Sequence, residues 1–455
     1  MRSRFALGAI AGLAALGLAL TGCSSSGSGS NPSSTSTAVD GKGRTLSVYV
    51  GASGLYPQQQ KEWFAELQAQ FKKETGADLA FDTFASSNDE LTKIQTSVVS
   101  GQGPDVYALG TTFTPTAYAT GAFVNLTDAD WAKIGGRDRF VPAALGMSGP
   151  DAKNQIGVPL AQRPFVMAYN KDLLKAAGID KPATTWDDFA SQAKKLTTGD
   201  TYGVAVGYAD NYDPWKFIWA MSTQAGNPIL DLKSGKARLD DPTTEKAYQT
   251  YFGWLTQQKA VDPAAVGWKN PQAVAAFAAG KAAYLPMVSA SSIEALDKSA
   301  VAGKYAYALM PTVAPGKTSN PSSGKPAASI VSGDNIVVAK YSKNQDLAFA
   351  YINMVTRADM QTKEFSLLGD LPSNAQAAAD LQKSKPIIAP IVDAIGKSVA
   401  TPFSGAWGDT QLALTNVVVQ SIPNLSNGSV SSSELSQLLK TAQSTAQSSL
   451  DKAKK

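Results

Sequence analysis

The chain has 455 residues and a formal net charge of +4, from 41 basic and 37 acidic side chains. This near balance argues against a nucleic acid or a strongly anionic partner, since either would normally require a basic face. Histidine is absent and cysteine occurs once, which excludes Ser-His-Asp triads, Cys-His pairs, intrachain disulfides and histidine-ligated metal sites.

The N-terminus is predicted to be a secretory signal peptide, residues 1–22. Arg2 and Arg4 precede an uncharged apolar run over residues 5–20, which is too short to span a bilayer comfortably. Residues 20–23, Leu-Thr-Gly-Cys, match the lipobox of bacterial lipoproteins. The sequence therefore predicts acylation of Cys23, cleavage before it, and a mature chain anchored to the outer face of the bacterial cell membrane. The alternative is an ordinary signal peptide with a cysteine there by chance.

Residues 23–43 are mainly Ser, Gly, Thr, Asn and Pro, and this composition predicts a flexible tether. The remainder of the chain is too long for one small core and favours two domains or lobes. No run of apolar residues after the signal peptide approaches the length of a membrane span.

The body alternates short apolar runs with amphipathic segments, which favours an α/β fold with parallel sheets covered by helices. Helices are expected over residues 58–73 and 89–100, the second capped by Asn88. Strands are expected at residues 45–50, 77–85, 105–110, 165–170, 202–207, 282–288, 305–310 and 335–340. Ligands of open α/β sheets bind beyond the carboxyl ends of the strands, so the loops after these runs are the candidate site.

Motifs for catalysis or cofactor binding are missing. The chain has neither a G-x-x-x-x-G-K-[ST] phosphate loop nor a strand-linked G-x-G-x-x-G. A paired-carboxylate mechanism of the glycosidase kind remains open in principle, but the spacing of the acidic residues indicates no pair. We expect no catalytic residues, no cofactor and no metal.

A family resemblance begins at residues 169–189, Tyr-Asn-Lys-Asp-Leu-Leu-Lys-Ala-Ala-Gly-Ile-Asp-Lys-Pro-Ala-Thr-Thr-Trp-Asp-Asp-Phe. This segment resembles extracellular solute-binding proteins of ABC transporters, especially the sugar-binding family. Locally it predicts a helix ended by Gly178, a break at Pro182, and a new helix with Thr185 and Asp188 in a capping-box arrangement. Three further stretches are similar to the same family in the same order: residues 100–106 (SGQGPDV), 277–284 (FAAGKAAY), and 341–351 followed by 371–374 (LPSN).

The resemblance implies a two-lobed periplasmic-binding-protein fold of type II, with a solute held in a cleft that closes by a hinge. It places the crossings between lobes near residues 167–168, 311–312 and 370–371. One lobe then comprises residues 44–167 and 312–370, and the other residues 168–311 and 371–455. The protein is expected to be a monomer that captures a sugar or oligosaccharide and docks on an ABC transporter permease, without chemical change to the solute.

Sugar sites pair aromatic platforms with hydrogen-bonding side chains. Of eight tryptophans, Trp407, in a Gly-rich loop, is the favoured platform, and Trp215 is open between platform and core. The others that the pattern assigns to packing are Trp63, Trp131, Trp186 and Trp254.

The polar candidates lie in loops at strand ends. Asn88 is either a helix cap or a ligand contact, and Arg163 either holds hydroxyls or a carboxylate in its fork or makes a salt bridge across the lobes. Ser289 stands where relatives often carry Gly-x-Trp, a departure that leaves the particular sugar in doubt. The remaining ligand candidates are Thr111, Thr112, Gln162, Asp334, Asn335 and Asp409.

Other functions remain as alternatives. The same fold can bind a polyamine, a peptide or an acidic solute; a ring of carboxylates would favour polyamines, whereas paired Arg or Lys would favour anions. An anchored glycoside-active enzyme and a surface protein for signalling or adhesion are the other classes.

Overall fold

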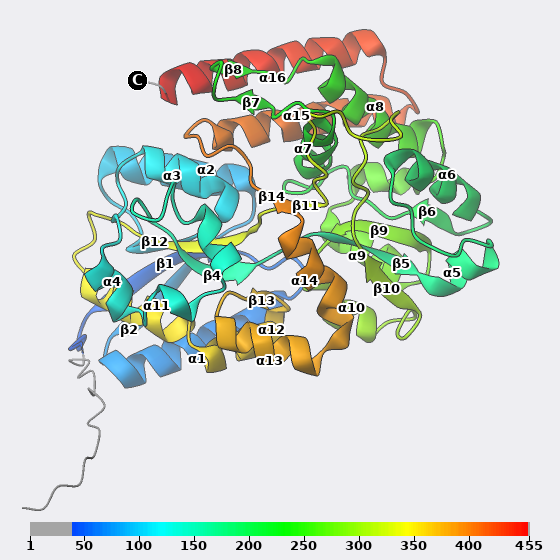
Figure 1. Cartoon of the computed structure of the whole chain (residues 1–455). Helices are drawn as coiled ribbons and strands as arrows, with labels where there is room; N and C mark the ends of the chain where they lie inside the picture. The colour runs from blue at the N-terminus through cyan, green and yellow to red at the C-terminus, as the bar shows by residue number, and fades with distance from the viewer. Residues whose placement is uncertain (1–38, 454–455) are drawn as a thin grey trace, which may run out of the picture. The chain divides into compact units, whose positions relative to one another are not determined.

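The structure is a computed structural model that describes residues 39–453 (Figure 1). The predicted signal peptide, Cys23 and most of the predicted tether lie outside the described residues. The end of that predicted tether is packed, because the backbone N–H of Gly41 donates to the carbonyl of Thr75 at 2.7 Å. None of the helices in the described part of the chain combines the length and the apolar character that a membrane span needs.

The first lobe is built on a six-stranded sheet of order β13-β4-β12-β3-β1-β2. Strand β1 pairs in parallel with β2 and β3, whereas β12 runs antiparallel to β3 and β4, and β13 antiparallel to β4. The strands are β1 (Thr45–Gly51), β2 (Asp78–Phe84), β3 (Val106–Gly110), β4 (Val158–Gln162), β12 (Gly333–Val338) and β13 (Leu371–Pro372).

Helices cover both faces of this sheet because its apolar side chains alternate. Leu46 and Val48 of β1 join one core with Trp63, Leu67 and other residues of α1, α11 and α12. Tyr49 of β1 joins a second core with residues of α2 and α3. The helices of this lobe are α1 (Pro57–Thr75), α2 (Ser87–Ser100), α3 (Thr114–Ala119), α4 (Asp128–Lys133), α11 (Gln345–Val355), α12 (Ala358–Leu368) and α13 (Ala375–Ser384).

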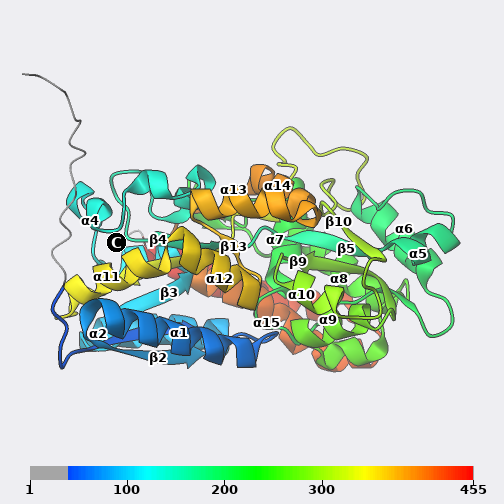
Figure 2. The ribbon, with the colours of Figure 1, turned by 90° about the horizontal axis from the view of Figure 1, so that it is seen from below.

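The second lobe is built on a four-stranded sheet of order β10-β5-β9-β6, in which only β6 and β9 pair in parallel. Its strands are β5 (Val166–Asn170), β6 (Tyr202–Val204), β9 (Ala282–Val288) and β10 (Tyr305–Ala308). Figures 1 and 2 show this sheet in the half of the body opposite the six-stranded sheet.

Residues of β5 and β9 face two cores of this lobe. Met167 and Met287 pack with α6, α7, α8, α15 and α16, while Val166 and Leu285 pack with α9, α10 and α14. The helices are α5 (Lys171–Ala176), α6 (Trp186–Leu196), α7 (Pro214–Gln224), α8 (Pro242–Thr256), α9 (Asn270–Ala278), α10 (Ser292–Asp297), α14 (Ala389–Gly396), α15 (Trp407–Ser426) and α16 (Ser432–Ala453). Two short pairs complete the strands, β7 (Leu230–Asp231) with β8 (Lys236–Ala237), and β11 (Ser329–Ile330) with β14 (Ser398–Val399).

The two-lobed α/β fold agrees with the prediction, but the expected parallel sheets are mixed instead. The reason is the path of the chain: β12 returns to the first sheet from the second and runs opposite to β3 and β4. The chain first passes between the sheets at residues 163–165, between β4 and β5, which is just before the predicted crossing at 167–168. The return from β10 to β12 covers residues 309–332. Residues 370–371, the third predicted crossing, lead into β13 of the first sheet.

Helix α6 begins where its sequence predicts, because the Thr185 side chain accepts a hydrogen bond from the backbone N–H of Asp188. This is one of the two bonds of the predicted capping box. Helix α2 differs from its prediction: Ser86, not Asn88, is the N-cap, and its hydroxyl accepts from the backbone N–H of Asp89 at 3.1 Å. Asn88 lies inside the first turn and is exposed.

Candidate solute-binding cavity

A cavity of about 500 Å³ lies between the two sheets, lined by residues of both lobes. Its walls include the loops that follow the carboxyl ends of β1, β3, β4 and β9, which is where open α/β sheets bind ligands. The loop before α7 and the residues before β12 complete it. The cavity therefore stands at the position that the sequence predicts for a ligand.

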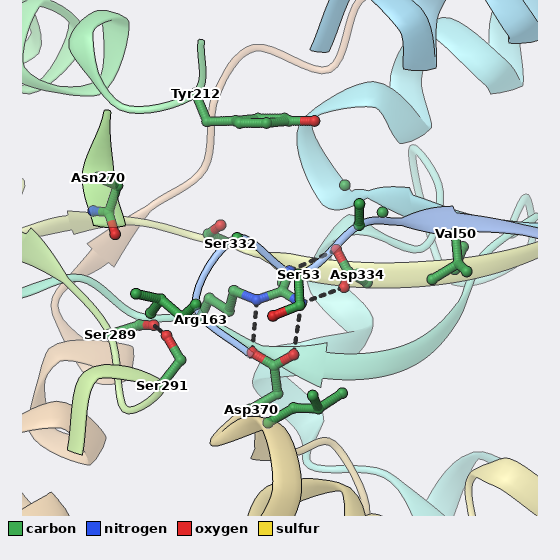
Figure 3. A pocket seen from close by; sticks show the side chains of 18 of the residues that line it. Val50, Ser53, Arg163, Tyr212, Asn270, Ser289, Ser291, Ser332, Asp334 and Asp370 are labelled. Atoms are coloured by element: carbon green, nitrogen blue, oxygen red, sulfur yellow. Dashed lines mark hydrogen bonds and ion pairs between the residues drawn. The ribbon is translucent and has the colours of Figure 1, made fainter. Parts of the chain in front are cut away.

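The centre of the first-lobe wall is an ion-pair cluster of Arg163, Asp334 and Asp370 (Figure 3). The Arg163 Nη1 and Nη2 atoms donate to the two carboxylate oxygens of Asp334 at 2.7 and 2.6 Å. Its Nε and Nη2 atoms donate to the two oxygens of Asp370 at 2.7 and 2.8 Å. Four hydrogen bonds from one planar guanidinium fix both carboxylates at the cavity wall.

Three adjacent strands bring this cluster together. Arg163 follows β4, Asp334 belongs to β12, and Asp370 precedes β13. Gly333, with φ of +155°, allows β12 to approach β4 here, because a Cβ at this position would lie 1.9 Å from the carbonyl oxygen of Ala161. The register shift between Asp334 and Asn335 marks the same irregularity in the strand pair.

Two buried carboxyl groups flank the cluster. Glu90 of α2 is 2% exposed, and its Oε1 accepts a hydrogen bond from the backbone N–H of Gly110 at 2.8 Å. Glu364 of α12 is 7% exposed. Burial raises the pKa of each group to about 8, and the neighbouring negative charges of Asp334 and Asp370 act in the same direction. Both side chains therefore hold a proton at neutral pH.

The second-lobe wall is centred on the loop before α7. Asp210 Oδ1 accepts from the backbone N–H groups of Tyr212 and Asp213, at 2.7 and 2.9 Å, and its Oδ2 accepts from the backbone N–H of Asn270 at 2.9 Å. These bonds hold the Tyr212 ring across the cavity from Arg163, Asp334 and Asp370 (Figure 3). Asp213 is paired with Lys216 at 2.7 Å.

Hydroxyl and amide side chains line the part of the cavity that lies between these two walls. The Ser289 and Ser291 hydroxyls lie 2.9 Å apart in the loop after β9, and Ser53, Ser332 and Asn270 also line the cavity. Aromatic faces combined with short polar groups can bind a molecule that has apolar ring faces and several hydroxyls. Within residues 39–453, no group of three or more metal-ligating side chains is arranged to hold a metal ion.

Six of the predicted ligand residues line this cavity, and Trp215 lies between the cavity and the core. Trp215 lines the wall at 2% exposure, while its ring packs edge-on against Trp407 with centroids 5.8 Å apart. The six are Thr111, Thr112, Arg163, Trp215, Ser289 and Asp334.

The sequence predicts that Trp407 is the aromatic platform of the site, but the structure places this residue away from the cavity. Its side chain is fully buried in the second-lobe core behind Trp215, because α15 begins at this residue and packs against α7. Asp409 lies in the first turn of α15, where it accepts a hydrogen bond from the Ser449 hydroxyl of α16 at 2.5 Å. Neither residue lines the cavity.

Asn335, Gln162 and Asn88 also lie away from the cavity. Asn335 is adjacent to Asp334 in a strand, so its side chain points to the opposite face, where Nδ2 donates to the Thr114 hydroxyl and the Met147 carbonyl. Gln162 is buried and donates to the Pro372 carbonyl, which joins β4 to β13. The Arg163 ion pairs are made within one sheet, which differs from a salt bridge across the lobes.

Sequence reasoning missed Tyr212, Glu90, Glu364 and Asp370 as cavity residues. A signal for Tyr212 was present, because it precedes the Pro214 helix start beside Trp215. The glutamates had none, since each is one of several polar residues in its helix and the sequence does not show which of them face inward.

Comparisons with known proteins agree with this geometry. The model of the bacterial extracellular solute-binding protein family matches residues 57–362. The diacetylchitobiose binding protein DasA of Streptomyces coelicolor is 25% identical over 373 residues, which cover 80% of this chain and 81% of the relative.

Two solved structures share the fold. A solute binding protein of an ABC transporter from Agrobacterium radiobacter K84, in complex with ribitol, superposes with a TM-score of 0.75 at 22% identity, over 90% of this chain and 99% of the other. The maltose-bound MalE3 of T. maritima gives a TM-score of 0.71 at 18% identity, over 88% and 98%. Since the family model matches more than half of the sequence, the chain belongs to the bacterial extracellular solute-binding protein family.

Proposed function

We propose that the protein is a membrane-anchored receptor that captures a sugar or oligosaccharide and delivers it to the permease of an ABC importer. The observation that carries this proposal is the interlobe cavity, in which the Tyr212 ring faces the fixed carboxylates of Asp334 and Asp370. Such a pairing of a flat aromatic surface with rigid acceptors suits a ring that bears hydroxyls. The relative named for diacetylchitobiose supports the same class of solute.

We propose that the protein binds its solute without changing it chemically. Retaining and inverting glycosidases place their two carboxyl groups on opposite sides of the scissile bond. Here Asp334 and Asp370 share one guanidinium, which commits both carboxylates to the same ion-pair cluster. This arrangement suits binding and release.

The proposed hinge consists of the segments between the two sheets, at residues 163–165 and 309–332. Because Arg163 lies in the first segment, the ion-pair cluster adjoins the hinge. Closure of the lobes around a solute would present one combined surface to a permease. The proposed anchor is lipid on Cys23, followed by the Ser/Gly-rich tether.

Solute class is tested by a thermal-shift screen of the mature protein, lacking residues 1–23, against monosaccharides, disaccharides, oligosaccharides, amino acids and polyamines. A solute that binds only the folded protein raises Tm, by the equivalent of about 2.7 kcal/mol at a hundred times its Kd. A rise with a carbohydrate supports the proposal. A rise with a polyamine or amino acid, and none with any carbohydrate, contradicts it.

Anchoring is tested separately on the full chain. Cys23→Ser should move the protein from the membrane fraction to the soluble extracytoplasmic fraction. If the Cys23→Ser variant remains in the membrane fraction, this result contradicts a lipid anchor at this residue. Ser24→Ala, one position along, is the matched control and should leave the protein in the membrane fraction.

A further inference from the structure

The two cations inside the cavity wall are committed to carboxylates of the protein. Arg163 directs four N–H bonds to Asp334 and Asp370, and the Lys216 ammonium is 2.7 Å from Asp213. An anionic solute would therefore have to displace an existing ion pair and approach the carboxylates behind it. The third basic residue of the lining, Lys269, is exposed at the rim, where solvent and salt screen its charge.

Acidic groups outnumber these cations in the lining. The cavity is bordered by six carboxyl groups. Glu90 and Glu364 are protonated, and the other four, of Asp210, Asp213, Asp334 and Asp370, still outnumber the three basic residues of the lining. In the first lobe, the Arg163 cluster alone leaves one uncompensated negative charge. In the second lobe, the Asp210 carboxylate accepts hydrogen bonds from backbone N–H groups and not from a cation. The interior thus favours a positive group.

Glu90 provides an acceptor that the protein leaves open. Its Oε1 accepts from Gly110, but its Oε2 receives no hydrogen bond from the residues that the structure describes. The side chain lines the cavity at 2% exposure, and the charge of Asp334 acts on it. This oxygen keeps contact with the cavity, so a donor on the solute can reach it.

An aromatic face lies opposite this acidic wall. Tyr212 stands across the cavity from Asp334, and the charges of Glu90 and Asp334 act on its hydroxyl. An aromatic ring on one side and carboxylates on the other is an environment in which organic cations bind, since the ring face attracts positive charge as well.

We propose that the solute carries a protonated amino group on a polyhydroxylated ring, as in an amino sugar, with the ammonium held between Tyr212 and the carboxyl groups of Glu90 and Asp334. This inference rests on the proposed function and narrows its solute class. As the ammonium binds, Glu90 releases its proton to solvent and Oε2 accepts from the ammonium, while the hydroxyls bond to the serines and to the outer edges of Asp334 and Asp370.

The test compares matched solutes by isothermal titration calorimetry on the mature protein. Glucose, the α-1,4-linked and the β-1,4-linked glucose disaccharides are each used in three forms: with hydroxyls only, with free amino groups at C2, and with N-acetylated amino groups. Spermidine represents a cation without hydroxyls. The same series is measured on Glu90→Gln, in which the side-chain oxygen still accepts from Gly110, and on Glu62→Gln, an exposed residue of α1, as control.

For at least one of the three sugars, the form with free amino groups should bind at least tenfold more tightly than the form with hydroxyls only. Glu90→Gln should reduce that ratio several-fold, and Glu62→Gln should not change it. Neutral or N-acetylated sugars that bind as tightly as the amines overturn the proposal and leave the sugar-receptor function standing. Spermidine binding without any carbohydrate binding overturns both. The absence of binding by every amine also overturns the proposal.

Discussion

Tyr56 donates a hydrogen bond from its hydroxyl to the backbone carbonyl of Ser291 at 2.5 Å. The same hydroxyl accepts from the backbone N–H of Ala295 at 3.2 Å. Tyr56 precedes α1 in the first lobe, whereas Ser291 and Ala295 belong to the start of α10 in the second. A second contact across the cavity joins the Ser87 hydroxyl to the Asn211 carbonyl at 3.2 Å. Direct hydrogen bonds therefore connect the lobes at two places beside the cavity.

Removing the Tyr56 hydroxyl should weaken solute binding. Tyr56→Phe keeps the ring but leaves the Ser291 carbonyl without this donor, at a cost of about 0.5–1.5 kcal/mol to the joined arrangement, or roughly a two- to tenfold rise in Kd. Titration calorimetry with the solute identified by the thermal-shift screen measures this. Tyr118→Phe is the control, because the Tyr118 hydroxyl makes no hydrogen bond among the described residues. Equal affinity of wild type and Tyr56→Phe would show that the contact does not contribute to binding.

Trp407→Ala should lower stability. The side chain is fully buried against Trp215, and removal of a large aromatic group from a core costs about 3–5 kcal/mol. Denaturant unfolding monitored by circular dichroism gives the change in unfolding free energy. A loss below about 1 kcal/mol would contradict the core placement of this residue.

Tyr212 should act on affinity with little effect on stability. Its ring lies at the cavity and is only half-buried, so Tyr212→Ala should raise Kd roughly tenfold by removing the aromatic face. Tyr212→Phe is the matched control, since the phenol hydroxyl makes no hydrogen bond within the described part of the chain. If both variants lose affinity equally, the hydroxyl and not the ring face is the binding group.

The Arg163 cluster should show strong coupling between its members. Arg163→Met removes the shared cation and leaves two carboxylates side by side, which should destabilise the fold by roughly 2–4 kcal/mol, less than a fully buried pair because the cluster opens on the cavity. The triple variant Arg163→Met, Asp334→Asn, Asp370→Asn should recover much of that loss. Additive losses in chemical unfolding would contradict the coupling.

Glu364 makes unfolding depend on pH. Its pKa is about 8 in the folded protein, chiefly through burial, against a usual value of 4.5. The folded state therefore binds more protons between these values, and the unfolding free energy falls as pH rises through this window, by at most about 1.4 kcal/mol per unit for this group. Glu364→Gln should flatten the decline measured from pH 5 to pH 8.5. Glu62→Gln, at an exposed position, should leave the slope unchanged; an unchanged slope in Glu364→Gln would contradict the raised pKa.

Patterns of local periodicity predicted much of the fold. Strand β9 has the predicted bounds, and β1, β3, β5 and β12 differ from theirs by one or two residues, because each is a buried apolar run ended by turn residues. Strand β4 was missed, since Pro159 argues against an interior strand. The structure accommodates Pro159 opposite the irregularity that begins at Gly333, far away in the sequence.

The residues of the site could be predicted only in part, because their placement also depends on how distant parts of the chain pair and pack. Arg163 was predicted from its place after an apolar run and Asp334 from the family resemblance, and both line the cavity. Whether a residue beside such a position faces inward depends on register, and a shift of one residue exchanges Asp334 for Asn335. Whether Trp407 faces the cavity or the core depends on where α15 starts and on what α15 packs against. The Gly-rich sequence around Trp407 reveals neither.

The ion-pair cluster adjoins a single sheet, since Asp334 lies in β12, Asp370 precedes β13, and Arg163 is the first residue after β4. Its charge pattern therefore exists before the second lobe meets the first. We expect a solute to meet this charge pattern before the lobes close around it, so that a solute of unsuitable charge dissociates without any closing motion. We therefore expect changes in the cluster to alter mainly the association rate, and changes at Tyr212 to alter mainly the dissociation rate.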